Sequence, residues 1–206
     1  ERMKNSFTFV TSAHWVFYTG MGLKYISNWG QKVIAVSDDI REYLMENYKV
    51  RYEDIFVTIN GIDTEKFSPE TDGAKVRAEF GLQAEEPTLV YVSRMDESRA
   101  LVARQLIAIA PKLAQAIPGG GDVFEELLEE SRKTNAQIGR ECITMTGGRT
   151  DINELVAVAD VFVGVSRAAL EAMAAEKPVI VAGNEGYIGL FGEDKLELAQ
   201  ENNFCC

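Results

Sequence analysis

The sequence predicts an α/β protein whose strands form parallel, Rossmann-like sheets. Short apolar runs alternate with helical segments along most of the 206 residues. Some of these runs are apolar without interruption, as in "PTLVYVSR" (87–94), which is typical of strands buried on both faces. Strand–helix–strand order requires the strands to pair in parallel, so the two patterns predict the same fold class.

Residues 1–62 predict one small α/β unit. Strands are expected at 7–14, 32–37 and 55–60, and a helix at 38–48. In that helix, "DDIREYLMENY", apolar residues recur at helical spacing, and Ser37 or Asp38 is a natural N-cap. Residues 63–86 follow, and the turn-forming and charged residues of "GIDTEKFSPETDGA" predict that they form a linker.

Residues 87–206 predict a second, doubly wound unit. Its strands are expected at 87–94, 142–148, 160–166 and 177–183, and its helices at 98–117, 122–135, 151–159, 167–176 and 194–203. Such alternation is typical of a parallel sheet with helices on both faces. One connection breaks the pattern, because "KLAQAIPGGGDVFEELL" passes from helix to helix through "PGGG". Either a strand is absent, or residues are missing between Pro118 and Gly119, or two helices pack consecutively on one side.

Composition argues against several classes of protein. Lys and Arg number 21 against 32 Asp and Glu, and the net charge of -11 disfavours a nucleic-acid binder and adhesion to anionic lipid by charge alone. No apolar run reaches the ~18 residues of a membrane span. One His and three scattered Cys predict no metal site and no disulfide framework, so the cytoplasm is the simplest compartment. "ERMKNSFTF" lacks an initiator Met and a signal-peptide core, so we expect the chain to be part of a longer protein.

Cationic side chains fall at the end of one predicted strand. Arg94 ends the strand at 87–94, and Arg99 lies five residues on, at the start of the next helix. Ligands of open α/β sheets bind at such strand ends, and two guanidinium groups there suit a diphosphate. Two solvated arginines would give the same pattern. "GGG" at 119–121 allows backbone amides to approach a phosphate, but it lacks the spacing of a dinucleotide-binding fingerprint.

Three other positions have both a binding and a structural explanation. Glu171 stands near the start of a helix, where its carboxylate either accepts two ribose hydroxyls or complements the helix dipole. "TGGR" (146–149) follows a strand and forms either the bed for a flat ligand or a plain turn. His14, the only histidine, is either a ligand-facing group or a satisfied structural residue.

Five segments together resemble a known family. They are "VIAVSDDIREYL", "INGIDTEKFSP", "VYVSRMDESR", "DINELVAVADVFV" and "ALEAMAAEKPVIVA". In this order, and over nearly the whole chain, they resemble the GT-B nucleotide-sugar glycosyltransferases, in particular the large retaining family 4. The resemblance implies two Rossmann-like domains. Residues 1–62 would be the incomplete remnant of the acceptor-side domain, 63–86 the linker, and 87–206 a donor domain truncated at its end.

The resemblance also implies roles for individual residues. Glu171 matches the second acid of the family's Glu pair and would hold the donor ribose, while Arg94 would bind the diphosphate and Arg99 stands where the family has Lys. His14 matches a His that faces the donor sugar, so the expected catalytic residues are His14, Arg94 and Arg99. The expected donor-binding residues are Glu171, Gly147, Gly148, Arg167, Gly164 and Gly186.

The chain departs from the family pattern just before Glu171. The family has a longer segment there, of the "EGFG" kind, which carries the first acid of the pair. Here "SRAALE" replaces it, and Val163 stands eight positions before Glu171, inside a predicted strand. In the family, the first acid of the pair contacts the transferred sugar. Because it is absent here, Gly164 and Arg167 are expected to line the space beside that sugar instead.

These observations predict a cytoplasmic glycosyltransferase that moves a sugar from a nucleotide-sugar donor, a UDP-sugar by expectation, with retention and without a metal. The resemblance places it in cell-envelope, glycolipid or polysaccharide synthesis. Two alternatives remain, a non-catalytic nucleotide-binding fragment of such an enzyme and a sugar-nucleotide epimerase on the same fold. The expected partners are the donor and an unidentified acceptor, and no nucleic acid. Peripheral membrane contact through the segment expected before residue 1, and self-association through exposed sheet edges, are left open.

Overall fold

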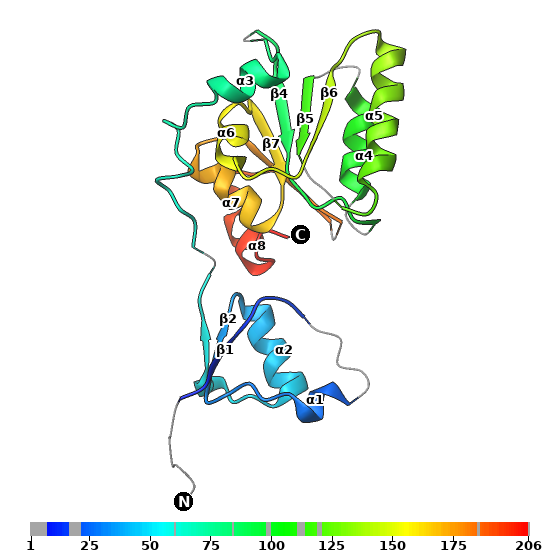
Figure 1. Ribbon diagram of the computed structural model, residues 1–206. Helices are drawn as coiled ribbons and strands as arrows, with labels where there is room; N and C mark the ends of the chain where they lie inside the picture. The colour runs from blue at the N-terminus through cyan, green and yellow to red at the C-terminus, as the bar shows by residue number, and fades with distance from the viewer. Residues whose placement is uncertain are drawn as a thin grey trace, which may run out of the picture. The chain divides into compact units, whose positions relative to one another are not determined.

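The computed structural model describes residues 8–16, 22–59, 61–83, 85–97, 100–110, 114–118, 121–184 and 186–205. The chain divides into two compact units, Glu1–Gly61 and Ile62–Cys206. Each unit has its own sheet and its own hydrophobic core (Figure 1). Both sheets are built from parallel strands with helical connections, so the predicted α/β class is confirmed.

The first unit contains a three-stranded parallel sheet in the order β1-β2-β3. Its elements are β1 (Val10–Ala13), α1 (Leu23–Ile26), β2 (Lys32–Ala35), α2 (Asp38–Tyr48), a 3-10 turn (Tyr52–Asp54) and β3 (Ile55–Val57). Helix α2 has the predicted bounds, and it buries Ile40 and Leu44 against Val33 and Ala35 of β2. Ser37 is its N-cap residue by position, although its side chain makes no capping hydrogen bond.

The second unit contains a six-stranded sheet in the order β6-β5-β4-β7-β8-β9. Its strands are β4 (Thr88–Tyr91), β5 (Ala114–Pro118), β6 (Ile143–Gly147), β7 (Val161–Gly164), β8 (Val179–Ala182) and β9 (Tyr187–Leu190). All neighbours pair in parallel except β9, which is antiparallel to β8. The chain therefore winds outward from β4 in one direction and then from β7 in the other.

Helices cover both faces of this sheet (Figure 1). They are α3 (Ala74–Phe80), α4 (Ala100–Ile109), α5 (Phe124–Ile138), α6 (Ile152–Ala157), α7 (Ser166–Ala174) and α8 (Leu196–Glu201), the last preceded by a 3-10 turn (Glu193–Lys195). Val90 of β4 packs in the cluster with α3, α6 and α7, whereas its neighbours Leu89 and Tyr91 pack in the cluster with α4 and α5. This alternation along one strand separates the two layers of the core.

A strand occupies the connection that the sequence predicted to lack one. Strand β5 lies between β4 and β6 and pairs with both, so the expected helix–helix join is wrong, and so is the alternative that a strand is absent. The alternative that residues are missing between Pro118 and Gly119 concerns a position outside the described residues. Helix α4 ends at Ile109 and does not continue to residue 117. The segment "AQAIP" has little intrinsic strand preference, and it forms a strand because it is paired along both edges.

Two further segments differ from the sequence reading. Residues 63–86 are not an extended linker, because Phe67 and Val76 are buried in the core of the second unit and α3 packs against α6. Strand β9 was not among the predicted strands; it follows a turn in which the N–H of Gly183 donates to the carbonyl of Gly186, which closes the hairpin with β8. Short elements like these carry too little periodicity to be recognised in advance.

The layered core gives a first prediction. Phe162 of β7 is fully buried, so Phe162→Ala should cost about 3–5 kcal/mol of the free energy of unfolding. Leu101 of α4 is half exposed, so Leu101→Ala should change it by less than about 0.5 kcal/mol. Urea unfolding followed by circular dichroism at the helix band measures both, since most helical residues lie in the second unit. Equal losses in the two variants would contradict the described packing.

Candidate functional site

The candidate site lies at the carboxyl edge of the six-stranded sheet. Strands β4 and β7 are paired at its centre, with Tyr91 opposite Val163, so the loops that leave these two strands are neighbours. The connection from β4 leads to β5 on one side, and that from β7 leads to β8 on the other. Such a reversal leaves a crevice at the carboxyl ends, which is where open α/β sheets bind ligands.

Most of the predicted site residues reach this edge. Arg94 lies in the loop after β4, Gly164 ends β7, and Arg167 and Glu171 lie in the helix that follows β7. Gly147 ends β6 with Gly148 directly after it, and Gly186 lies in the hairpin between β8 and β9. Arg99 lies outside the described residues.

Arg94 is available for a ligand. Its side chain is exposed, and no ion pair to it occurs among the residues that the structure describes. The hydroxyl of Ser93 donates to the carbonyl oxygen of Arg94 (3.1 Å), which ties the backbone at this point. An unpaired guanidinium at the carboxyl end of a central strand is well placed to bind an anionic group.

The loop after β4 is braced by the loop after β5. The N–H of Val123 donates to the carbonyl oxygen of Met95 at 3.0 Å. A Cβ atom on Gly121 would lie 2.5 Å from the carbonyl carbon and oxygen of Met95, so only glycine fits there. Gly121 therefore permits contact between two loops, which differs from the phosphate-cradling role considered for "GGG"; the other two glycines lie outside the described residues.

The loop after β6 is built on two glycines. Gly147 has φ of +70°, a left-handed conformation that favours glycine, and Gly148 is exposed with open space around the position of its missing Cβ. The next residue, Arg149, is largely buried and forms ion pairs with Glu79 and Asp151. The sequence reading did not single out Arg149. The signal was present, since an arginine stood two residues before an acid at a predicted helix start.

Glu171 and Arg167 form a pair on α7. Arg167 Nε donates to Glu171 Oε1 at 2.9 Å, and the side chains are 66% and 12% exposed, respectively. Glu171 is the sixth residue of α7, so it lies beyond the first turn, where a helix dipole favours acids. Arg167 stands in that first turn, where a cation is unfavourable, and an Arg-to-Glu order along the helix is the weaker one. Helix stability therefore does not explain this pair.

The start of α7 is held by a distant segment. Ser166 has φ of +50°, and its N–H donates to the carbonyl oxygen of Phe204 at 2.6 Å. Phe204 is buried, and its ring centroid lies 5.7 Å from that of Phe191. The backbone N–H at this helix start therefore already has a partner from the segment after α8.

His14 belongs to the first unit. It follows β1, its side chain is exposed, and its Nε2 atom lies 3.2 Å from the Ser12 hydroxyl. The adjacent strand β2 leads to Ser37, whose hydroxyl is buried and makes no hydrogen bond among the described residues. The carboxyl edge of the small sheet thus presents His14 beside the start of α2.

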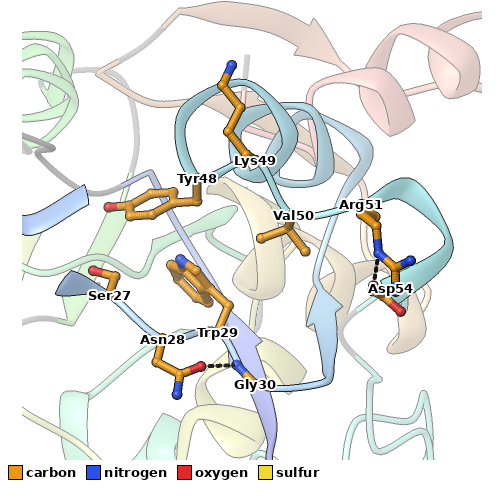
Figure 2. Close-up of a pocket in the computed structure, with 9 residues that line it drawn as sticks. All are labelled: Ser27, Asn28, Trp29, Gly30, Tyr48, Lys49, Val50, Arg51 and Asp54. Atoms are coloured by element: carbon orange, nitrogen blue, oxygen red, sulfur yellow. Dashed lines mark hydrogen bonds and ion pairs between the residues drawn. The ribbon is translucent and has the colours of Figure 1, made fainter. Parts of the chain in front are cut away.

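A hollow of about 300 Å³ lies at the opposite, amino edge of the same sheet (Figure 2). Its lining residues come from the segments before β2 and β3 and from the end of α2; they are Ser27, Asn28, Trp29, Gly30, Tyr48, Lys49, Val50, Arg51 and Asp54. The rings of Trp29 and Tyr48 meet edge to face at 5.2 Å. Asp54 forms ion pairs with Lys32 (2.8 Å) and Arg51 (2.6 Å), so these three charged groups neutralise one another.

With this geometry described, the family can be assigned. The family model of the group 1 glycosyl transferases matches residues 86–203, which is more than half of the chain and most of the second unit from residue 86 onward. The chain belongs to this family. All of the candidate site residues of the second unit fall inside the matched range.

A similar curated protein matches this chain over only part of its own length. The chain is 27% identical over 207 residues to EpsD of Bacillus subtilis, which is named as a putative glycosyltransferase; the match covers 84% of the chain and 52% of EpsD. The chain therefore spans about half the length of the curated relative it matches.

Solved structures show the same fold. A glycosyltransferase from Rickettsia africae is 21% identical, with a TM-score of 0.64, covering 82% of the chain and 50% of that protein. HepE from Anabaena in complex with UDP is 23% identical, with a TM-score of 0.57, covering 73% and 44%. Similarity at this level confirms the GT-B type of fold.

No described helix is both long enough and apolar enough to span a membrane. Among the described residues, no three His, Cys, Asp or Glu side chains are grouped in a way that could hold a metal ion.

The network around Asp54 predicts a dependence of stability on pH. Hydrogen bonds from Lys32 and then Arg51 lower the pKa of Asp54 below its ordinary value. A carboxyl group with a lowered native pKa stabilises the fold above its unfolded pKa of about 4 and loses this contribution as the pH falls through the native pKa. Asp54→Asn should therefore be less stable than the parent at neutral pH, and the difference should shrink below about pH 4.

Tryptophan fluorescence during urea unfolding measures this effect, because Trp15 and Trp29 both lie in the first unit. Glu42→Gln, at an exposed position on α2, is the control and should leave the difference between neutral and acid pH unchanged. A pH profile of Asp54→Asn that parallels the parent would contradict the role of the network.

Proposed function

We propose that the chain forms the donor-binding part, and a portion of the acceptor-side part, of a retaining GT-B glycosyltransferase of family 4. It would transfer a sugar from a UDP-sugar to an acceptor in cell-envelope, glycolipid or polysaccharide synthesis. The family assignment and the GT-B type of fold support this proposal. Retention, independence of metal and the biosynthetic setting come from the sequence resemblance.

The pairing of Glu171 with Arg167 is the observation that carries the proposal. Glu171 is only 12% exposed and its charge is balanced by one exposed arginine. A carboxylate in this position can accept two hydroxyl donors, as from the 2- and 3-hydroxyls of ribose. Because the pair lacks an explanation in helix stability, we assign Glu171 to the donor ribose and Arg167, with Gly164, to the space beside the transferred sugar.

Phosphate binding is assigned to the loop after β4. Arg94 is exposed and lies at the carboxyl end of the central strand, and Arg99 follows it in the sequence. As the bond between sugar and phosphate breaks, negative charge builds on the leaving diphosphate. Cations fixed beside it stabilise that charge, which is usually the largest contribution to catalysis of this kind.

The remaining assignments concern the base, the hairpin and the sugar. Gly147 and Gly148 would lie under the base, since glycines let a flat ring approach the backbone. Gly186 would border the nucleotide from the hairpin after β8, and the sequence resemblance assigns His14 to the donor sugar. Uracil is favoured as the base because HepE, a protein of the same fold, was crystallised with UDP and with UDP-glucose.

A second candidate function is nucleotide binding without turnover. Val163 stands where the family has its first acid, and it is buried in β7. The N–H at the start of α7 is bonded to the carbonyl of Phe204. Both features remove groups that would otherwise contact the transferred sugar, so a chain that binds nucleotide but transfers nothing is the expected alternative.

We further propose a cytoplasmic location and self-association through the exposed edge of the first sheet. Phe9 and Val10 at β1 are partly exposed, which leaves apolar surface on an edge strand. Light scattering after size exclusion tests the association, and a monomer at high concentration would contradict it. Contact with a membrane surface and the identity of the acceptor depend on parts of the protein outside these residues.

Calorimetric titration of the chain with UDP, GDP and ADP tests the donor site. UDP should bind saturably, and Glu171→Gln and Arg94→Ala should each weaken it by about tenfold or more, because each loses charge-assisted hydrogen bonds worth about 1.5–3 kcal/mol. Activity on a UDP-sugar then separates transfer from binding alone.

Matched controls come from α5. Glu129 and Lys133 form the same i,i+4 type of pair at 3.5 Å, and Arg132 is an exposed arginine on that helix. Glu129→Gln and Arg132→Ala should leave UDP binding unchanged. If the parent chain binds no nucleotide, the proposed donor site is wrong.

A further inference from the structure

We propose that Arg149 is a positioning residue, which clamps the loop after β6 onto α3 and thereby sets the discrimination between nucleotide bases. The inference rests on the proposed function, since it takes Gly147 and Gly148 of that loop as the bed for the base. It assigns a role to Glu79, a residue in the segment that the sequence suggested was only a linker.

Arg149 uses its whole guanidinium group in three interactions. Nη1 and Nη2 donate to the two carboxylate oxygens of Glu79 on α3, at 2.5 and 2.9 Å. Nε and Nη2 also donate to the two oxygens of Asp151, at 2.8 and 2.6 Å. The guanidinium further lies 5.2 Å from the ring centroid of Phe80, within range of a cation–π contact. A fork that engages two carboxylates fixes orientation as well as position.

This clamp differs from an ordinary surface ion pair. The side chains of Arg149 and Asp151 are 15% and 19% exposed and that of Glu79 is 40% exposed, whereas the single ion pair between Arg140 and Glu86 joins groups that are 48% and 46% exposed. Single exposed pairs contribute little, while an arginine fork that joins two carboxylates holds a defined geometry. Hydrogen bonds from Arg149 also lower the pKa values of Glu79 and Asp151, so both carboxylates stay charged at neutral pH.

The clamp acts on a loop that contains two consecutive glycines. Two consecutive glycines leave the backbone at 147–148 without side chains that could pack, and glycine gives that backbone more freedom than any other residue. Asp151, held by Arg149, is the N-cap residue of α6, and its carbonyl accepts from the N–H of Leu155 at 3.2 Å. Arg149 therefore ties the end of the glycine pair to the start of the next helix.

Helix α3, which carries Glu79, is anchored in the core of the second unit. Val76 of α3 is fully buried and packs in the core cluster with Leu155 and Val156 of α6. A Cβ on Gly73, just before α3, would lie 2.5 Å from a methyl group of Val158, so the helix start is packed closely on the end of α6. Glu79 is thus presented from a helix that cannot shift without opening the core.

The experiment compares ligands with and without a base. Arg149→Met, Arg149→Lys and Glu79→Gln are titrated with UDP, GDP, ADP and inorganic pyrophosphate. Loss of the clamp should weaken UDP binding by about tenfold, because the loop must then be ordered on binding. It should also narrow the differences in affinity among UDP, GDP and ADP. Pyrophosphate binding should stay unchanged. Arg149→Lys keeps the charge but not the fork, so it should fall between the parent and Arg149→Met.

Arg140→Met, which removes the exposed pair with Glu86, is the matched control and should bind all four ligands as the parent does. Unchanged UDP affinity in Arg149→Met and Glu79→Gln would overturn the positioning role. A loss in Arg149→Met alone would also overturn it, because it would mean that Arg149 touches the ligand itself. If the parent chain binds no nucleotide, the proposed donor site fails as a whole, which is a distinct result.

Discussion

The parallel pairing of β4 with β7 is the constraint on which the second unit depends. These strands are far apart in sequence, because β5 and β6, which lie on the other side of β4, come between them in the chain. The chain must then cross back and continue in the other direction. This single pairing brings the loop with Arg94 beside the helix with Arg167 and Glu171. Without it, the cation and the carboxylate would belong to separate surfaces.

Strong local patterns could be read from the sequence, whereas marginal ones could not. Helix α2 was predicted with its observed bounds because its apolar spacing and its acids in the first turn agree. Strand β5 was missed because "AQAIP" continues the composition of the helix before it, and only pairing with β4 and β6 makes it a strand. The candidate residues of the second unit, apart from Arg99, which lies outside the described residues, were correctly expected at one edge of the sheet. The alternation of strands and helices alone is enough to predict where the strands end.

Partners in space were beyond the reach of sequence reasoning. Nothing in "TGGR" indicates that its arginine meets a glutamate 70 positions earlier, since that contact requires the path of the chain between them. The Ser166–Phe204 hydrogen bond is hidden for the same reason. The Arg167–Glu171 pair was within reach, because a spacing of four places two side chains on the same face of a helix.

The contact between Gly121 and Met95 has a thermodynamic consequence for any anion that binds near Arg94. A loop braced by its neighbour through a backbone hydrogen bond is already ordered before the ligand arrives. Its conformational entropy is lost during folding and not during binding, so association at this edge need not offset it a second time. The diphosphate would then meet a loop held by the Gly121–Met95 contact, and the base a glycine pair held by Arg149, so both parts of the nucleotide would bind to backbone that is already ordered.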